Sequence, residues 1–158
     1  MTKEQILREC CFDFSKAKTI HAWLNEGNDQ PTTVNKVVTA YTDESGKRWV
    51  HLCAGKFDFL LDIKNLSGKE IWNDANKLCE DNGMELPSKS MWELIQAFRP
   101  EVNKVIEDLE GEPLKDWYWA GDEYFGDYAW RFGATNGVLY IDNKPNTNGV
   151  RGSLALKF

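Results

Sequence analysis

Residues 117–132 read WYWAGDEYFGDYAWRF. Large aromatic side chains are concentrated at the two ends of this stretch, in residues 117–120 and 128–132, and a glycine-flanked loop at 121–126 separates them. Aromatic residues are enriched in β-strands, and glycine punctuates strands at turns. The stretch therefore predicts two strands joined by a polar and aromatic loop.

The same pattern continues toward the C-terminus. Residues 138–141 and 153–158 predict two more strands, because β-branched, aromatic and alternating apolar residues recur there. The glycine-bounded residues 133–137 and the polar residues 142–149 predict the connecting loops.

Helices are predicted before this strand region. Apolar residues at helical spacing predict helices over residues 71–79 and 88–98. Asn82-Gly83 is a typical helix stop, and Pro87-Ser88 is a typical helix start. Residues 101–109 predict a further helical turn or two.

The first third of the chain predicts one helix followed by a β-meander. Residues 2–24 carry an amphipathic pattern, which indicates a helix. Residues 34–42 and 47–54 flank the turn sequence at 43–46 and predict a hairpin, and residues 57–63 predict a third strand. The chain as a whole is therefore expected to have an α+β fold.

Composition and charge narrow the classes of protein to which the chain can belong. Apolar residues make up 42% and charged residues 28% of the 158 residues, which is typical of a globular domain. The formal net charge is −6, so nucleic acid is not an expected partner. No apolar stretch is long enough to span a membrane, and the first ten residues do not resemble a secretory signal. We therefore expect a cytoplasmic protein without a membrane association.

The cysteines agree with a reducing compartment. Their spacing resembles neither a disulfide framework nor a zinc site. All four are expected to be free thiols: Cys10, Cys11, Cys53 and Cys79.

Five sequence blocks occur in the same order as in a known family: Trp72-x-x-Ala75, Leu86-Pro87-Ser88, Tyr118-Trp119, Ala129-Trp130 and Val150-Arg151. Over about residues 72–151 the chain resembles the C-type lectin-like domain that ends the collagen-like adhesins of Legionella. The resemblance implies two helices and a twisted antiparallel sheet whose loops present a variable binding surface. It also implies buried packing for five residues, with Trp130 on a central strand: Trp72, Leu86, Trp92, Trp119 and Trp130.

The resemblance divides the chain into two parts. Residues 67–158 are expected to form the C-type lectin-like domain. Residues 1–66, the helix and β-meander, are expected to be either a subdomain or a decoration of the same sheet. Gly152 stands where many relatives have cysteine, so a disulfide from this position to Cys79 cannot form.

The loops after Ala120 and Ile141 are the expected binding surface. Tyrosine with short polar residues is the composition of adaptable recognition loops, and amides both donate and accept hydrogen bonds. Arg131 is expected to point away from the core, because it alternates with Trp130 and Phe132. The candidate binding residues are Asp122, Glu123, Tyr124, Tyr128, Arg131, Asn143, Asn146 and Asn148.

Other interpretations of the acidic loop stay open. With Asn143 or Asn148, the carboxylates Asp122, Glu123 and Asp127 could be metal ligands, and they could also be catalytic groups or part of a solvated turn. A recognition loop fits their composition best.

No catalytic or metal site is expected elsewhere. The tripeptide Trp72-Asn73-Asp74 resembles a calcium-binding motif of lectins, but it opens a predicted helix. His51 and Cys53 alternate on a strand and share a face, yet a buried, structural Cys53 is the favoured interpretation, because the sequence does not place an orienting Asp or Asn beside His51.

The expected function is non-enzymatic recognition of a protein or glycan ligand, without a cofactor. The alternative is a small phage- or mobile-element-encoded inhibitor that binds a host protein through an acidic surface. Residues 101–127 carry nine carboxylates against two lysines, and such a segment can dock on a basic groove.

Overall fold

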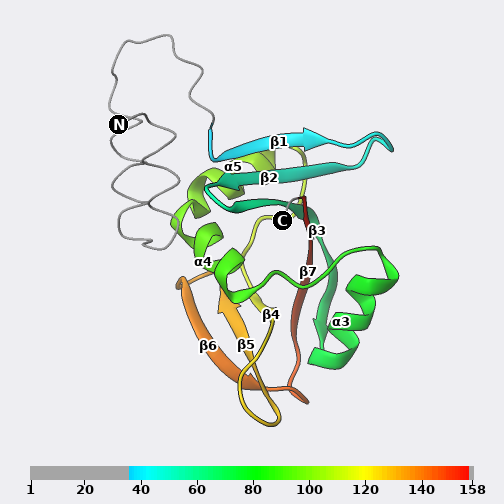
Figure 1. Cartoon of the computed structure of the whole chain (residues 1–158), viewed down its shortest axis with the longest axis vertical. Coiled ribbons are helices and arrows are strands. Elements are labelled where there is room, and N and C mark those ends of the chain that lie inside the picture. The colour runs from blue at the N-terminus through cyan, green and yellow to red at the C-terminus, as the bar shows by residue number, and fades with distance from the viewer. Residues whose placement is uncertain (1–35, 157–158) are drawn as a thin grey trace.

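The computed structural model describes residues 36–156. Two predictions lie outside the described residues: the helix over residues 2–24 and the free thiols of Cys10 and Cys11. The described part is a mixed α+β structure with three helices and one seven-stranded sheet, in the order β1-β2-β3-β7-β4-β5-β6 (Figure 1). Its strand pairs are antiparallel except for the parallel pair β4–β7. No helix among these residues is long and apolar enough to cross a membrane.

Three strands come first along the described chain, then three helices, and then four strands. The strands are β1 (Val38–Thr42), β2 (Arg48–Ala54), β3 (Phe57–Glu70), β4 (Trp117–Glu123), β5 (Tyr128–Gly133), β6 (Val138–Asn143) and β7 (Asn148–Ala155). The helices are α3 (Trp72–Asp81), α4 (Lys89–Ala97) and α5 (Arg99–Asp108). The predicted hairpin around residues 43–46 and the two predicted central helices are confirmed, and α5 is a full helix where the sequence predicted only a turn or two.

The β1–β2 turn shows how local chemistry sets the first hairpin. Gly46 has a φ of 87°, a left-handed conformation that glycine adopts without strain. The Asp43 carboxylate accepts hydrogen bonds from the Ser45 hydroxyl and from the Trp49 indole, at 2.6 and 2.9 Å. These two bonds, the Ser45 bond first, lower the pKa of Asp43 to about 2. The turn is therefore fixed by a carboxylate that stays ionised over the physiological range.

Two strand predictions are wrong at their ends. β3 was predicted to end at residue 63 but continues to Glu70, and β7 begins at Asn148 rather than at residue 153. The two strands pair with each other through several register shifts, and this long-range pairing overrides the polar, turn-like composition of both segments. The boundary expected between residues 66 and 67 falls inside β3, and the division into two parts stays a prediction.

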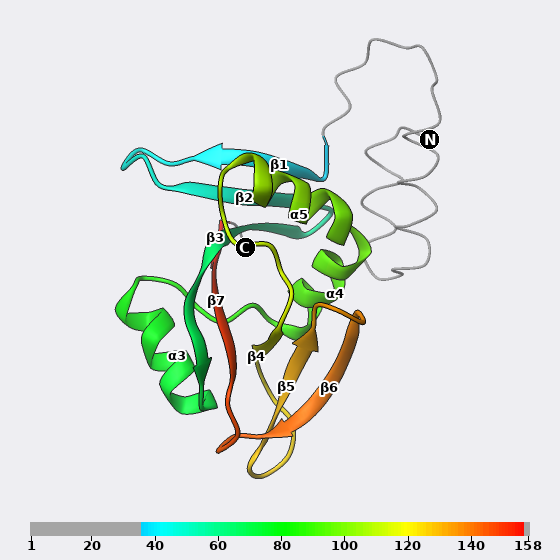
Figure 2. The same cartoon turned by 180° about the vertical axis from the view of Figure 1, so that it is seen from behind.

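The two faces of the sheet are covered differently (Figures 1 and 2). One face, which carries Val50, Leu52, Phe59 and Leu61, forms the larger core with α4 and α5. The other face, which carries Trp49, Leu60, Trp119 and Val150, packs against Ala75 and Cys79 of α3. Because α3 packs against β3, β4 and β7, the centre of this second face is covered.

The second face also carries two groups of polar and aromatic residues, one on either side of the part that α3 covers. We call the first the β2 flank, which comprises Tyr41, His51, Cys53 and Asp58, and the second the β5 flank, which comprises Arg131, Tyr140, Asp142 and Asn148. Strand register places each set on the α3 side of the sheet, since His51 is opposite Leu60 and Arg131 is opposite Trp119. Tyr41 is 42% exposed and Tyr140 is 59% exposed.

Tryptophan side chains satisfy the backbone of the central strand β4. The indole N–H of Trp92 donates to the Trp119 carbonyl and that of Trp72 to the Ala120 carbonyl, at 3.3 and 2.9 Å. Trp119 in turn donates to the Glu70 carbonyl at 2.7 Å. A buried carbonyl without a donor is costly, so these bonds compensate for the sparse pairing between β4 and β7.

The five residues expected to pack in the interior do so to different degrees. Leu86, Trp92 and Trp119 are buried, and Trp72 and Trp130 are half-buried. Trp92 stacks on Tyr118 and on Phe132, with ring centroids 5.5 and 4.8 Å apart. Trp130 lies on β5, which is next to the edge strand β6 rather than at the centre of the sheet, where it was expected.

Arg151 connects β7 to the segment that follows α5. Its side chain is fully buried, and its guanidinium donates to the carbonyls of Asp62 and Glu112 at 3.0 and 2.6 Å. Hydrogen bonds from a charged donor are stronger than neutral ones. One side chain therefore ties β7, β3 and the α5–β4 connection together.

Candidate functional site

The loop between β4 and β5 lies beside the turn between β6 and β7, at the lower end of the molecule in Figure 1. Lys144 joins them: its backbone N–H donates to the Asp127 carbonyl at 2.7 Å, and its ammonium forms an ion pair with Glu123 at 2.8 Å. The same ammonium lies 4.6 Å from the centre of the Trp72 ring. We call residues 123–128 and 143–147 the paired loops.

Asp142, at the end of β6, organises the β6–β7 turn. Its Oδ1 accepts from the Asn143 backbone N–H at 2.9 Å and from the Asn146 amide at 2.8 Å. Its Oδ2 accepts from the Asn148 amide at 3.0 Å and from Arg131 at 3.1 Å. A carboxylate has about four acceptor positions. The chain's own donors therefore satisfy all of them.

The surroundings of Asp142 act on its pKa in both directions. Burial raises the pKa, and the hydrogen bonds from Asn148 and Asn146 together with the charge of Arg131 lower it by more, so that the net change is downward. Asp142 is thus an ionised carboxylate that holds the turn.

Arg131 lies on the face opposite to Trp92 and Phe132, as its alternation on β5 predicted. It contacts Asp142 and the Asn148 side-chain oxygen, and its guanidinium carbon lies 4.1 Å from the centre of the Trp117 ring. Asn148 itself is only 3% exposed.

Aromatic side chains project from the β4–β5 loop. Phe125 is 80%, Tyr124 58% and Tyr128 41% exposed. Tyr124 meets the Trp130 ring edge-on at 5.7 Å, and the Lys89 ammonium lies 3.8 Å from the centre of that ring. The loop is closed by hydrogen bonds from Tyr124 N–H to the Tyr128 carbonyl and from Tyr128 N–H to the Phe125 carbonyl. These rings are therefore held at the surface by a hydrogen-bonded loop.

The predicted site residues separate into two groups. Arg131, Asn146 and Asn148 donate hydrogen bonds to Asp142 from their side chains, and Asn143 donates one from its backbone N–H. Asp122, Tyr124 and Tyr128 lie near the start of α4 or in the loop next to it, where Asp122 accepts a hydrogen bond from the Lys89 backbone N–H at 2.9 Å. Glu123 connects the two groups through Lys144.

Three residues of this region were not among the predicted site residues: Phe125, Asp142 and Lys144. Asp142 lies directly opposite Ala129 in the β5–β6 hairpin, which brings it next to Arg131 on the same face. The pairing of residues 128–133 with 138–143 around a glycine-bounded turn was the signal for this contact. The Lys144 contacts depend on a loop conformation that sequence periodicity does not specify.

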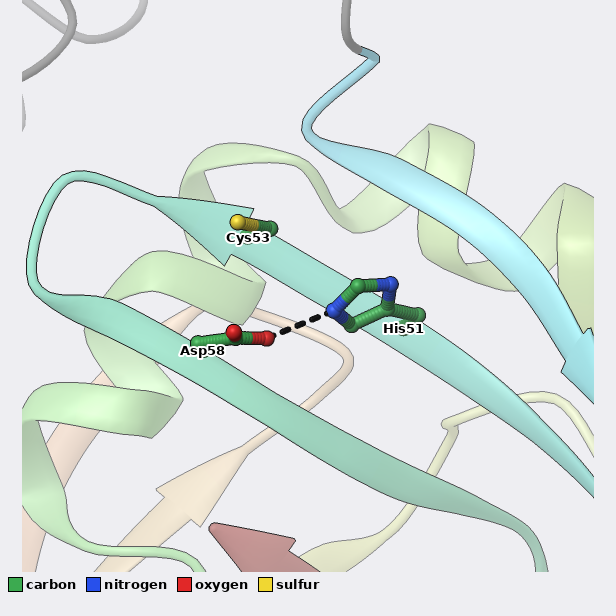
Figure 3. Close-up of side chains that lie close together, drawn as sticks. All are labelled: His51, Cys53 and Asp58. Carbon is green, nitrogen blue, oxygen red and sulfur yellow. Dashed lines mark hydrogen bonds and ion pairs between the residues drawn. The ribbon is translucent and has the colours of Figure 1, made fainter. Parts of the chain in front are cut away.

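The β2 flank brings together three residues with metal-binding side chains: His51, Cys53 and Asp58. One donor atom from each lies within 4.8 Å of the others, and His51 Nε2 is 2.6 Å from Asp58 Oδ1 (Figure 3). The expectation of a buried Cys53 is wrong, because Cys53 is exposed. Asp58, which the sequence alone did not place beside His51, lies opposite Cys53 on β3. Within residues 36–156 the acidic loop at 122–127 forms no comparable group of His, Cys, Asp or Glu ligands.

The acidic segment is largely at the surface. Lys104 forms an ion pair with Asp108 at 3.6 Å, and both side chains are more than half exposed. Exposed carboxylates follow along the end of α5 and the connection to β4: Glu107, Asp108, Glu110, Glu112 and Asp116.

Comparisons with known proteins do not assign the chain to a family. No protein-family model matches it, and no curated protein is significantly similar to it.

Proposed function

We propose that this protein is a non-enzymatic recognition domain of the C-type lectin-like kind that binds a protein or glycan ligand through the paired loops. The observation that carries the proposal is the set of exposed rings, Tyr124, Phe125 and Tyr128, on a hydrogen-bonded loop. Exposed aromatic side chains that are already ordered make effective binding anchors, because little conformational entropy is lost when they are covered.

The polar half of the paired loops complements these rings. Asn146 and Asn143 are exposed beside the turn that Asp142 holds, and they can offer amide donors and acceptors to hydroxyl or peptide groups. Asn148 and Asp142 form the support beneath this turn. The proposed surface thus combines rigid aromatic contacts with adaptable polar ones, the composition typical of recognition loops.

The lectin-like assignment rests on the five sequence blocks and on the order of elements. Two helices, α3 and α4, precede the strands β4 to β7, and Trp72 and Trp119 of the blocks, together with Trp92 of α4, donate hydrogen bonds to the backbone around β4. The proposed cellular location is a reducing compartment, the cytoplasm, where Cys53 and Cys79 stay outside disulfides.

The test uses pull-down from a lysate and a glycan array, each performed with three proteins: the wild type, Tyr124→Ala/Phe125→Ala and the acidic quadruple variant. The quadruple variant replaces Glu107, Asp108, Glu110 and Glu112 with their amides. A partner that the wild type captures should be lost from the aromatic variant, and the quadruple variant should retain it.

Affinity for the captured ligand gives the quantitative result. Tyr124→Ala and Asn146→Ala should each weaken binding, and loss of the aromatic anchor should cost about 2 kcal/mol, roughly thirtyfold in Kd. Salt should have little effect. A ligand whose affinity survives both substitutions, falls steeply with salt and is lost from the quadruple variant would favour the acidic surface as an inhibitor's docking site instead.

A further inference from the structure

The β2 flank places three side chains of metal-ligand type at one point of the sheet, independently of the paired loops. His51 and Cys53 alternate on β2 and so share a face, and Asp58 on β3 lies directly opposite Cys53. The turn that joins the two strands is short, and its Gly55 has a φ of 57°. The hairpin therefore fixes the spacing of the three residues through backbone register.

The donor atoms converge rather than form a chain. His51 Nε2 approaches Asp58 Oδ1 at 2.6 Å, and the Cys53 sulfur lies within 4.8 Å of the other two donors. In Figure 3, Cys53 and Asp58 are on the side of the imidazole that carries Nε2, and the other ring nitrogen faces away from both. A catalytic Cys–His–Asp relay would use the two ring nitrogens for different partners. Here both partners lie on the side of the same nitrogen.

Imidazole, thiolate and carboxylate are the three ligand types that Zn²⁺ takes in proteins. In a tetrahedral zinc site the nitrogen and oxygen ligands are about 3.4 Å apart and the sulfur is about 3.6 Å from each, as follows from the usual bond lengths. The His51–Asp58 pair would open by less than about 1 Å, and the Cys53 sulfur would approach by about 1 Å at most. The side chains of His51 and Asp58 are 28% and 22% exposed, which leaves them room to rotate.

We propose that His51, Cys53 and Asp58 bind a divalent transition-metal ion of the Zn²⁺ class at the surface of the β2–β3 hairpin. Three protein ligands leave a fourth coordination position of the metal open. Because Cys53 is exposed, water or a side chain of another molecule can reach this fourth position. This set of one sulfur, one nitrogen and one oxygen ligand disfavours Mg²⁺ and Ca²⁺, which prefer oxygen ligands only.

Cys79, the other described cysteine, is a poor competitor for the metal. It lies on α3 and is fully buried in the cluster that includes Leu60 and Val150, and burial raises the pKa of its thiol to about 12, so it stays protonated. Cys10 and Cys11 lie outside the described residues, and the experiment therefore has to separate them from Cys53.

The test is a Co²⁺ titration of the full-length, tag-free chain, followed by displacement with Zn²⁺. Co²⁺ bound through a thiolate gives a charge-transfer band in the near ultraviolet and visible bands whose intensity reports a low coordination number. We expect one Co²⁺ per chain, both sets of bands, and their loss when Zn²⁺ is added. Cys10→Ser/Cys11→Ser is the matched control and should give the same spectrum.

The ligand variants identify the site. Cys53→Ser should abolish the charge-transfer band, and His51→Gln and Asp58→Asn should each weaken Co²⁺ binding by more than about tenfold, since losing even a supporting residue of a metal site costs that much. Far-ultraviolet circular dichroism of each variant checks that it folds. Absence of the bands in the wild type, or a band that survives Cys53→Ser and disappears in Cys10→Ser/Cys11→Ser, would overturn the proposal. His51 and Asp58 would then act only as a hydrogen-bonded pair.

Discussion

The two flanks of the sheet lie on the same face, on either side of α3, but they use their carboxylates differently. Asp142 on the β5 flank accepts four hydrogen bonds from Arg131, Asn143, Asn146 and Asn148. Asp58 on the β2 flank faces an imidazole and a thiol, two groups that are common ligands of transition-metal ions.

The difference separates a supporting role from a binding role. A carboxylate whose acceptor positions are filled by the chain holds the chain in place, and its removal should be felt in stability. A carboxylate among other metal-ligand side chains contributes little to the fold until an ion arrives. β7 and the buried Arg151 join the two halves of the sheet. Substitutions at Arg151, on the β5 flank and on the β2 flank should therefore have effects of different size.

The largest effect on stability is expected at Arg151. Arg151→Ala removes the donor to the Asp62 and Glu112 carbonyls and leaves a cavity beside Tyr118, so the free energy of unfolding should fall by about 3–5 kcal/mol. Urea unfolding followed by tryptophan fluorescence measures it. The exposed Arg48 provides the control, because Arg48→Ala should change stability by less than about 0.5 kcal/mol. Equal effects of the two substitutions would contradict the role of Arg151.

A smaller effect is expected on the β5 flank. Asp142→Ala leaves Arg131 and the Asn148 amide without their shared acceptor, and should cost about 2–3 kcal/mol. Amide hydrogen exchange should quicken in residues 143–148, which tests whether the loss is local to the turn. A variant with normal exchange there would show that Asp142 does not hold the turn.

The pH dependence of the same site sharpens this prediction. The folded state lowers the pKa of Asp142, so in acid this carboxyl group binds fewer protons in the folded chain than in the unfolded chain. The stability that it adds is therefore lost as the pH falls below the usual carboxyl value of 3.8. The stability gap between the wild type and Asp142→Asn should therefore be widest near neutral pH and narrow in acid. Asp43 titrates in both proteins, so its contribution cancels. A gap that stays constant down to pH 3 would contradict the lowered pKa.

The smallest effect is expected on the β2 flank. In the presence of a chelator, His51→Gln and Asp58→Asn should each change the free energy of unfolding by less than about 1 kcal/mol, because a partly exposed pair contributes little. The same urea titrations measure it. A loss as large as that of Asp142→Ala would mean that this flank, too, is a structural support, and the contrast between the flanks would disappear.

Local signals predicted much of the fold. The turn at Asp43–Gly46, the start of α4 after Ser88 and the strands β4 and β5 follow from residue types that act within a few positions of one another. The ends of β3 and β7 could not be found in this way, because Asn65 to Gly68 and Asn148 to Gly149 have turn-like composition and become strand only through the long-range pairing of β3 with β7. Such pairing depends on residues more than seventy positions apart.

The candidate sites show the same limit. Exposed Tyr124 and Tyr128 were predictable from a glycine-flanked aromatic loop, whereas the Lys144 contacts that join this loop to the β6–β7 turn required the tertiary structure. Asp58 was within reach of sequence reasoning. A two-residue turn at Gly55-Lys56 sets Cys53 opposite Asp58, and the hairpin register then brings Asp58 to His51.

Gly152 of β7 leaves room for the end of the Met84 side chain. A Cβ at this position would lie 2.5 Å from the Met84 sulfur and 3.3 Å from a Leu66 methyl, so Met84 already fills the space that a larger residue would need. A side chain at position 152 would therefore require the end of the flexible Met84 side chain to move aside. Substitution at Gly152 is thus tolerated only to the extent that the Met84 thioether can adopt another rotamer.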